Sequence, residues 1–364
     1  MPVEIQEHRR ALHQIPELDK HLPRTFAYLQ TALAGFRCQV FSPVAGSLCA
    51  WFDFGQDHAL AFRADADALP ILEKTGAAYA SCHRGNMHAC GHDGHMAIVL
   101  ELARRLDQMT GLPHNILLVF QSAEETTGGA RDICDSGVFQ KYAVRAIFGL
   151  HLWPGLEAGV IASRCPELMA RSCEVNVDIY GTSAHIAKAS QGVDALAAGA
   201  EFYRRAAALE QSLPDGVFRL LKFGKFQSGT VRNALSAHTH MEGSLRAFQD
   251  SVFDGLCQGL DAIARETEKA YGCRVEIHRS EGYPAVMNPE GLYRQVLAAL
   301  PFRQLELPSM TAEDFSWYQR TIPGLFFFLG LGDVPALHTD TFDFDDAILT
   351  KGADFFEKLA NLPL

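Results

Sequence analysis

The chain lacks any hydrophobic run long enough to cross a membrane. Its longest apolar candidate, residues 324–331, is too short for that role and indicates a buried strand. The first residues are polar and charged, without the apolar core of a secretory signal peptide. We therefore expect neither membrane association nor export.

An excess of positive charge is also missing. Lysine and arginine number 32 against 43 aspartates and glutamates, which gives a net charge of -11 at pH 7. Proteins that bind nucleic acids or anionic membranes usually do so through basic surfaces. The acidic balance therefore argues against both classes of partner, although it does not exclude a local basic site.

Paired cysteine spacing is absent as well. The nine cysteines are an odd number and are scattered between residues 38 and 273. In a chain of this length, such usage indicates reduced thiols and not a disulfide framework. We expect a cytoplasmic protein.

The patterns that are present indicate an α/β domain. With 364 residues, the chain is long enough for two domains of roughly 100–200 residues each. Strand-like runs at 47–54, 59–63, 115–121 and 146–150 alternate with helical patterns at 94–109 and 128–136. This alternation predicts a central mixed sheet flanked by helices.

The pattern changes near residue 170, which predicts an inserted domain. Strands at 171–180, 219–229, 237–247 and 273–281 combine with helices at 193–213 and 250–271. The order β-α-β-β-α-β is that of a ferredoxin-like module. We expect a catalytic domain from residues 1–169 and 282–364, and a lid or dimerisation domain from residues 170–281. An exposed edge strand in the insert favours a homodimer.

Residues 87–95, Met-His-Ala-Cys-Gly-His-Asp-Gly-His, carry the strongest chemical signal. One thiol, one carboxylate and three imidazoles lie within nine residues, just before a helical pattern. Cys90 and His92 can both face one metal ion from a turn, and a thiolate favours zinc or a similar borderline metal. A buried cysteine and a helix-capping histidine are the alternative interpretation.

Two adjacent acids form a second candidate position. Glu124 and Glu125 follow an apolar strand and precede a glycine-rich helix start. One carboxylate can bind a metal while its neighbour acts as a general base, as metal-assisted hydrolysis requires. Acids are also common at helix N-termini without any such role.

Three further residues lie at strand ends or in loops. His151 follows an apolar strand, and His338 lies in a polar loop near the C-terminus. Asp65 ends another strand and could orient a ligand from behind, or simply belong to a turn closed by Pro70. A lone histidine is more often structural, but several candidates at sheet ends favour one shared site.

Eight motifs in order carry a family resemblance. They are RRALHQIPEL, FRADADALP, MHACGHDGHMA, QSAEETTGGA, GLHLWP, GTSAHIA, PSMTAEDF and LHTDTFDF. On these motifs, the chain resembles the metal-dependent amidohydrolases that include aminoacylases (N-acyl-L-amino acid amidohydrolases), hippurate hydrolases and hydrolases of indole-acetyl amino acids. These enzymes form the cysteine-bridged dinuclear branch of a metallopeptidase superfamily.

The resemblance implies two divalent metal ions, zinc or manganese, with cobalt or nickel as alternatives. It implies that Cys90 bridges the ions and that the other ligands are His92, Glu125, His151 and His338. Glu124 is implied as the general base and acid. Asp65 is implied to support the ligands from behind.

In the inserted domain, the resemblance implies three further roles. His185 would stabilise the tetrahedral oxyanion, reaching into the site of a partner subunit. Asn233 and Arg246 match positions that hold the substrate carboxylate, which arginine can grip through two parallel hydrogen bonds. Without the motif, His185 is equally a strand-end cap and Arg246 a solvated strand residue.

These observations predict an amidohydrolase that cleaves N-acyl, for example N-acetyl or N-aroyl, L-amino acids to a carboxylate and a free amino acid. A dipeptidase or carboxypeptidase on the same scaffold is the enzymatic alternative. A non-catalytic metal-binding dimeric scaffold is the alternative from another class, and it would have no need of Glu124.

Overall fold

The computed structural model describes residues 3–364. The chain divides into two compact units. The first unit comprises Met1–Leu168, Met287–Leu307 and Asp314–Leu364, and the second comprises Met169–Val286 and Pro308–Glu313.

The second unit includes a short segment that the predicted boundaries of 170 and 281 leave out. Residues 308–313 return to it and hydrogen-bond to its backbone and side chains. Ala170 N–H donates to Thr311 O at 2.8 Å, and Arg246 Nη1 donates to Met310 O at 2.6 Å. These are long-range contacts, which local sequence patterns do not encode.

A mixed sheet forms the centre of the first unit, in the order β1-β2-β4-β3-β5-β14-β6-β13. Strands β4, β3, β5 and β14 run parallel, whereas β2 and β6 are antiparallel to β4 and β14. The predicted mixed α/β sheet is therefore confirmed. The strands are β1 (Gln39–Phe41), β2 (Ser47–Phe52), β3 (Ala59–Asp65), β4 (Asn115–Gln121), β5 (Val144–Pro154), β6 (Ile161–Ser163), β13 (Arg303–Gln304) and β14 (Gly324–Gly332).

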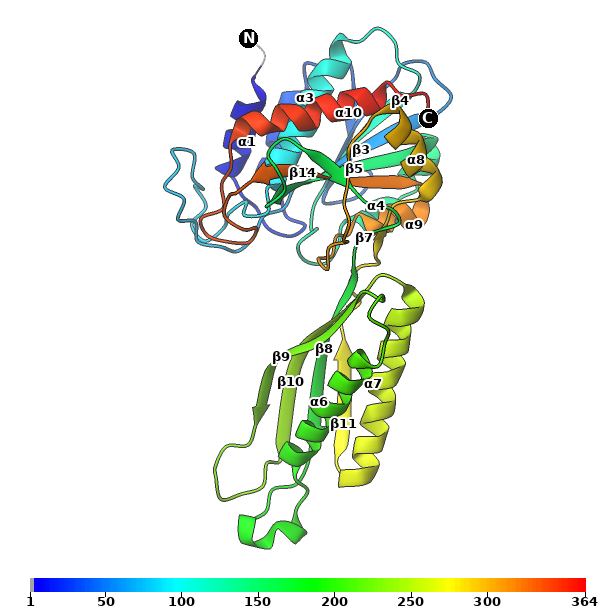
Figure 1. The fold of residues 1–364 in the computed structure, drawn as a ribbon. Helices are drawn as coiled ribbons and strands as arrows, with labels where there is room; N and C mark the ends of the chain where they lie inside the picture. The colour runs from blue at the N-terminus through cyan, green and yellow to red at the C-terminus, as the bar shows by residue number, and fades with distance from the viewer. Residues whose placement is uncertain (1–2) are drawn as a thin grey trace. The chain divides into compact units, whose positions relative to one another are not determined.

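Helices cover both faces of this sheet because its central strands are apolar on both sides. In β14, Leu325, Phe327 and Leu329 join the core beneath α3 and α10, while Phe326 contacts the ring of Phe315 at 4.8 Å on the opposite face. Figure 1 shows α1, α3 and α10 side by side over the sheet. The helices of this unit are α1 (Ile5–His13), α2 (Pro23–Leu33), α3 (His92–Gln108), α4 (Ala130–Asp135), α5 (Val138–Lys141), α8 (Glu290–Ala299), α9 (Ser316–Thr321), η2 (Asp346–Ile348) and α10 (Leu349–Ala360).

The second unit has the ferredoxin-like element order that the sequence predicts. Its antiparallel sheet has the order β11-β8-β10-β9, and Figure 1 shows α6 and α7 together along one face. A separate apolar core fills the space between these helices and the sheet. The elements are β8 (Arg171–Tyr180), η1 (Ile186–Gln191), α6 (Ala195–Gln211), β9 (Arg219–Ser228), β10 (His238–Ala247), α7 (Asp250–Tyr271) and β11 (Arg274–Arg279), and two short strands, β7 (Glu167–Met169) and β12 (Val286–Met287), form a third sheet.

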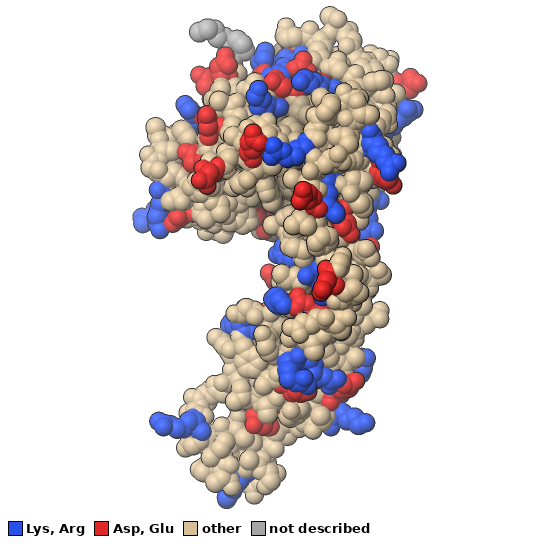
Figure 2. All heavy atoms as spheres, viewed as in Figure 1, with Lys and Arg blue, Asp and Glu red and all other residues tan. Residues whose placement is uncertain are grey.

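Across residues 3–364, no helix is both long and apolar enough to cross a bilayer. On the face in view in Figure 2, acidic and basic side chains are interspersed over each unit. Neither unit therefore presents a large surface of one charge on that side.

Candidate metal centre

The carboxyl ends of β3 and β4 bring the first acidic residues together. The two strands are parallel neighbours, and their last residues, Asp65 and Gln121, lie opposite each other. The loops that follow then meet: the Asp67 carboxylate accepts hydrogen bonds from the backbone N–H groups of Glu124 at 3.0 Å and Glu125 at 3.1 Å. This is the edge at which α/β sheets commonly build their sites.

The turn before α3 presents Cys90 and His92 to the same place. Gly91 between them has a φ of +87°, a left-handed conformation that glycine adopts without steric cost. His92 is buried, and its Nδ1 lies 2.8 Å from the carbonyl oxygen of Asp67. A carbonyl can only accept, so Nδ1 carries a proton, and Nε2 is the nitrogen that the neutral ring can offer to a metal. That Nε2 has no hydrogen-bond partner among the described residues.

All five residues predicted as metal ligands lie in the first unit, in two groups that share one atom. Cys90, His92 and His151 form one triad, and Cys90, Glu125 and His338 form the other. The Cys90 Sγ lies 3.5 Å from His151 Nε2 and 3.2 Å from His338 Nε2. Glu125 Oε1 lies 3.2 Å from His338 Nε2 and 3.8 Å from His92 Nε2. The arrangement suits two ions with a thiolate between them.

The backbone differs from expectation at two of these ligands. His151 lies inside β5 and not at its end, because the pairing of β5 with β14 continues to Pro154. His338 has a φ of +63°, which is uncommon for a residue other than glycine. Strained conformations of this kind concentrate at functional sites.

The electrostatic environment favours the neutral form of two predicted ligands, Cys90 and His151, and the charged form of Asp65 behind them. Burial, followed by the carboxylates of Glu125 and Glu124, raises the pKa of the Cys90 thiol well above its usual range. Burial lowers the pKa of His151 to about 3, so its imidazole is neutral. Burial disfavours the charged form of Asp65, but the Arg63 guanidinium and then the nearby His92 and His95 hold its pKa well below the usual value. An ion bound at Cys90 must therefore displace a tightly held proton.

The donor set fits a borderline divalent metal. One thiol, three imidazoles and one carboxylate are the sulfur, nitrogen and oxygen ligands that zinc prefers, and carboxylate and imidazole also suit manganese or cobalt. The Nε2 atom of buried His92 is independent evidence for a bound metal. It has no hydrogen-bond partner among the described residues, and a buried polar atom of this kind is costly unless something binds it.

Glu124, the predicted general base, lies beside these ligands. Its side chain is buried, and its carboxylate forms a group with the ligand atoms of His92 and Glu125 in which all lie within 4.8 Å of one another. The neighbouring acids thus present two carboxylates to one place.

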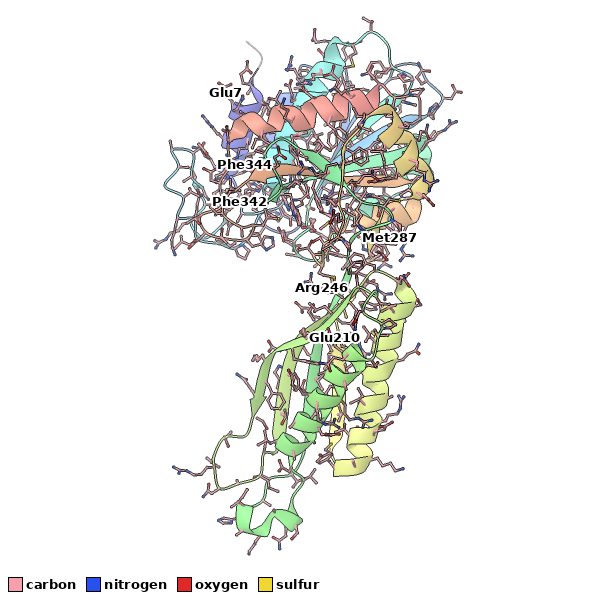
Figure 3. All side chains as sticks on the ribbon, in the orientation of Figure 1. Glu7, Glu210, Arg246, Met287, Phe342 and Phe344 are labelled. Carbon is pink, nitrogen blue, oxygen red and sulfur yellow. The ribbon has the colours of Figure 1, made fainter. Side chains whose placement is uncertain are left out.

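The predicted residues of the second unit fall into two places. Asn233 O accepts from the backbone N–H of Ile186 at 3.0 Å, which brings Asn233 next to His185. Arg246 lies near the far end of β10, which begins after Asn233 at His238 (Figure 3). Eight strand residues span roughly 26 Å, so a single copy of this unit does not bring Arg246 to His185 and Asn233.

Sequence reasoning missed some residues that organise the centre. Asp67 lies two positions after Asp65 in the same motif, so its fixed spacing could have indicated it. Arg63 pairs with Asp65 at 2.7 Å and with Asp314 at 2.8 Å, a link across 251 residues that spacing does not reveal.

Comparison with known proteins agrees with this architecture. The family model described as peptidase family M20/M25/M40 matches residues 61–362. An uncharacterized hydrolase of Staphylococcus haemolyticus is 33% identical, over 98% of this chain and 97% of that protein.

Two solved structures are similar over 98% of this chain and 96% of theirs. One, from methicillin resistant Staphylococcus aureus, has a TM-score of 0.92 and 27% identity. The other, the YxeP protein of Bacillus subtilis, is described as a dinuclear metal binding peptidase of the M20 family and has a TM-score of 0.85 and 29% identity. The chain itself therefore belongs to peptidase family M20/M25/M40 and is a hydrolase of that family.

Proposed function

We propose that the protein is a metal-dependent amidohydrolase that cleaves N-acyl L-amino acids to a carboxylate and a free amino acid. The observation that carries this proposal is the pair of ligand triads that share the Cys90 sulfur, with the Glu124 carboxylate beside them. The dinuclear description of the similar Bacillus subtilis structure supports two ions. Zinc or manganese suits the donor set best, with cobalt or nickel as alternatives.

This proposal assigns a role to each of the five predicted ligands and to Glu124. Cys90, His92 and His151 would hold one ion, and Cys90, Glu125 and His338 would hold the other. When bound, the ions supply Lewis acidity that polarises the amide carbonyl and lowers the pKa of water. Glu124 takes a proton from the attacking water and delivers it to the leaving nitrogen.

Substrate binding is assigned to the second unit. The guanidinium of Arg246, or the amide of Asn233, binds the carboxylate of the amino acid, and His185 stabilises the oxyanion. Because Arg246 lies far along β10 from the other two, we assign His185 and Asn233 to the site of a partner subunit. A homodimer through the second unit follows from this assignment.

The exposed side chains of the second unit support the dimer. Five of the eight large hydrophobic side chains that are exposed among the described residues belong to this unit. Leu196 and Tyr203 lie seven residues apart on α6, and Phe226 lies on the edge strand β9. An apolar helix surface beside an unpaired strand edge is typical of a surface that a second copy covers.

The location we propose is the cytoplasm. All nine cysteines are free thiols in the structure, and free thiols are typical of a reducing compartment.

The decisive experiment compares Glu124→Gln with the unchanged enzyme on N-acetyl and N-benzoyl amino acids and on dipeptides, with added zinc or manganese. Glu124→Gln should keep its fold and metal content but lose roughly 10²–10⁴-fold in kcat, the usual contribution of a general base. Glu157→Gln, an exposed acid on the same unit, is the matched control and should keep full activity.

The other outcomes discriminate between the candidate functions. Faster hydrolysis of dipeptides than of N-acyl amino acids would assign a dipeptidase or carboxypeptidase. Metal binding without hydrolysis of any amide would assign a non-catalytic scaffold. Substantial activity in Glu124→Gln would remove this residue from the role of base.

A further inference from the structure

The peptide of Leu152, which follows His151, is held on both sides by imidazoles. Its N–H donates to His95 Nε2 at 2.9 Å, and its carbonyl lies 2.7 Å from His151 Nδ1. All three residues are buried. The positions of the two histidine rings are therefore coupled through one peptide group.

Hydrogen-bond direction fixes the tautomer of each ring. A backbone N–H can only donate, so His95 Nε2 has a lone pair and the proton is on Nδ1. That proton is directed to Asp65 Oδ1 at 2.6 Å, and the other oxygen of Asp65 accepts from Arg63 Nη1 at 2.7 Å.

The tautomer of His151 is fixed in the same way. A carbonyl can only accept, so the proton of His151 is on Nδ1, and Nε2 presents its lone pair toward Cys90 Sγ, 3.5 Å away. A bond to the second ring nitrogen is the usual way in which proteins orient a metal-binding histidine.

The side chain of Leu152 is located by the same turn. A Cβ added to Gly91 would lie 3.1 Å from Leu152 Cδ1, and one added to Gly94 would lie 2.6 Å from it. The two glycines leave the space that Leu152 fills, and His95 binds its amide. Residues 91–95 therefore fix both the backbone and the side chain of Leu152.

We propose that His95 is a positioning residue for His151: through the Leu152 peptide, it sets the orientation and tautomer of His151 and hence the metal affinity of the Cys90–His92–His151 triad. Arg63 and Asp65 anchor His95 from behind. His95 contributes no ligand itself. This inference rests on the metal centre proposed above.

Two substitutions of His95 separate its two hydrogen bonds. In His95→Asn the amide reaches about as far as Nδ1, so it can still donate to Asp65 but leaves the Leu152 N–H unpaired. In His95→Gln the amide oxygen reaches about as far as Nε2 and can accept from Leu152. Both variants introduce an amide, and they differ in whether the hydrogen bond to Asp65 or the one to Leu152 is kept.

The experiment is a Co²⁺ titration of the metal-free forms of the unchanged protein and both variants. Thiolate-to-cobalt charge-transfer absorption reports binding at Cys90, and chelator competition gives the two dissociation constants. We expect His95→Asn to weaken the binding of one Co²⁺ ion by roughly 10–100-fold and the binding of the other by less than about threefold. In His95→Gln, both affinities should lie within about threefold of those of the unchanged protein.

Equal losses in both variants, equal weakening of both ions, or no weakening in His95→Asn would overturn the positioning role. If His95→Asn does not fold, ¹⁵N spectra of histidine-labelled unchanged protein decide the matter, with His95→Gln identifying the His95 signal. A proton on Nδ1 supports the inference and a proton on Nε2 overturns it. If the unchanged protein binds no Co²⁺, the metal centre itself fails, which is a different result.

Discussion

Single buried charges in this protein are compensated by several partners at once, and Arg9 is the clearest case. It is fully buried, and its guanidinium donates to Asp93 at 3.0 Å, Asp343 at 2.7 Å and Asp346 at 2.5 Å. It also lies 4.0 Å from the ring centre of Phe344, one of the side chains marked in Figure 3. Arg9 thereby ties α1 to the turn that carries His92 and to the segment after His338.

Loss of this guanidinium should be costly. Arg9→Met leaves three carboxylates without their shared cation, and breaking a buried pair in this way typically costs about 3–5 kcal/mol of unfolding free energy. Arg10→Met is the control, because Arg10 is half exposed and its ion pair among residues 3–364 is with Asp346 alone, so a loss of about 0–1 kcal/mol is expected. Urea unfolding measures both values, and equal losses would contradict the assignment.

The neighbouring His13 predicts a pH dependence of stability. Burial by itself lowers the pKa of His13, but hydrogen bonds to Asp93 and Glu73 outweigh it and raise the pKa from 6.5 to about 9. Burial favours the neutral form of Glu73, yet its bonds with His13, Thr75 and Ser81 lower its pKa from 4.5 to about 2. The stabilisation from the raised pKa of His13 is fully present below pH 6.5 and is lost as the pH rises through 9. The stabilisation from the lowered pKa of Glu73 is present above pH 4.5 and is lost as the pH falls through 2.

The measurement is the difference in unfolding free energy between the unchanged protein and His13→Gln. Both pKa shifts describe the same His13–Glu73 interaction and are therefore not additive. The difference should shrink by about 2–3 kcal/mol between about pH 6 and about pH 9.5. A difference that is constant with pH would show that His13 is not charged in the fold.

At the scale of elements, the docking of α3 against β5 depends on the absence of a side chain at Gly94. An added Cβ would lie 2.6 Å from Leu152 Cδ1 and 3.1 Å from both Leu349 Cδ2 and Phe344 Cζ. These neighbours belong to the apolar core and cannot all move away.

Gly94→Ala should therefore destabilise the protein by about 1–3 kcal/mol, the usual cost of overpacking. Gly291→Ala, near the start of α8, is the matched control, because nothing lies within 4 Å of its added Cβ. There the better helix propensity of alanine should stabilise by about 0.5–1 kcal/mol. Thermal unfolding should show shifts of opposite sign, and shifts of the same sign would contradict this account.

Local patterns predicted most elements because the periodicity in them is strong. The predicted strand 171–180 and helix 250–271 coincide with β8 and α7, in which one face is buried and the other polar. The extension of β5 to Pro154 was missed, since it depends on pairing with β14 from a distant part of the chain. For the same reason, the sequence indicated residues that could bind metal but not the hydrogen bonds and ion pairs of Asp67, His95 and Arg9, which join distant segments.

At the scale of the whole molecule, the proposed dimer makes a mutational prediction. Tyr203 on α6 is 47% exposed and Leu307 in the first unit is 68% exposed. Tyr203→Glu should convert a dimer to a monomer and abolish turnover, because His185 is then not supplied by a partner. Leu307→Glu should change neither. Light scattering combined with an activity assay tests this prediction. A wild-type protein that is monomeric and fully active would contradict both the proposed dimer and the shared role of His185.

The order of segments along the chain has a consequence for synthesis. Strand β14 lies between β5 and β6 in the sheet, yet it follows the whole second unit in the sequence. At about 5–20 residues per second, a ribosome needs roughly 10–40 s to travel from His151 to His338. During that interval the nascent protein carries an unpaired β5 edge and an incomplete set of ligands. We expect the predicted metal site to be completed only after β14 and His338 have been made, which is a consequence of the position of one strand.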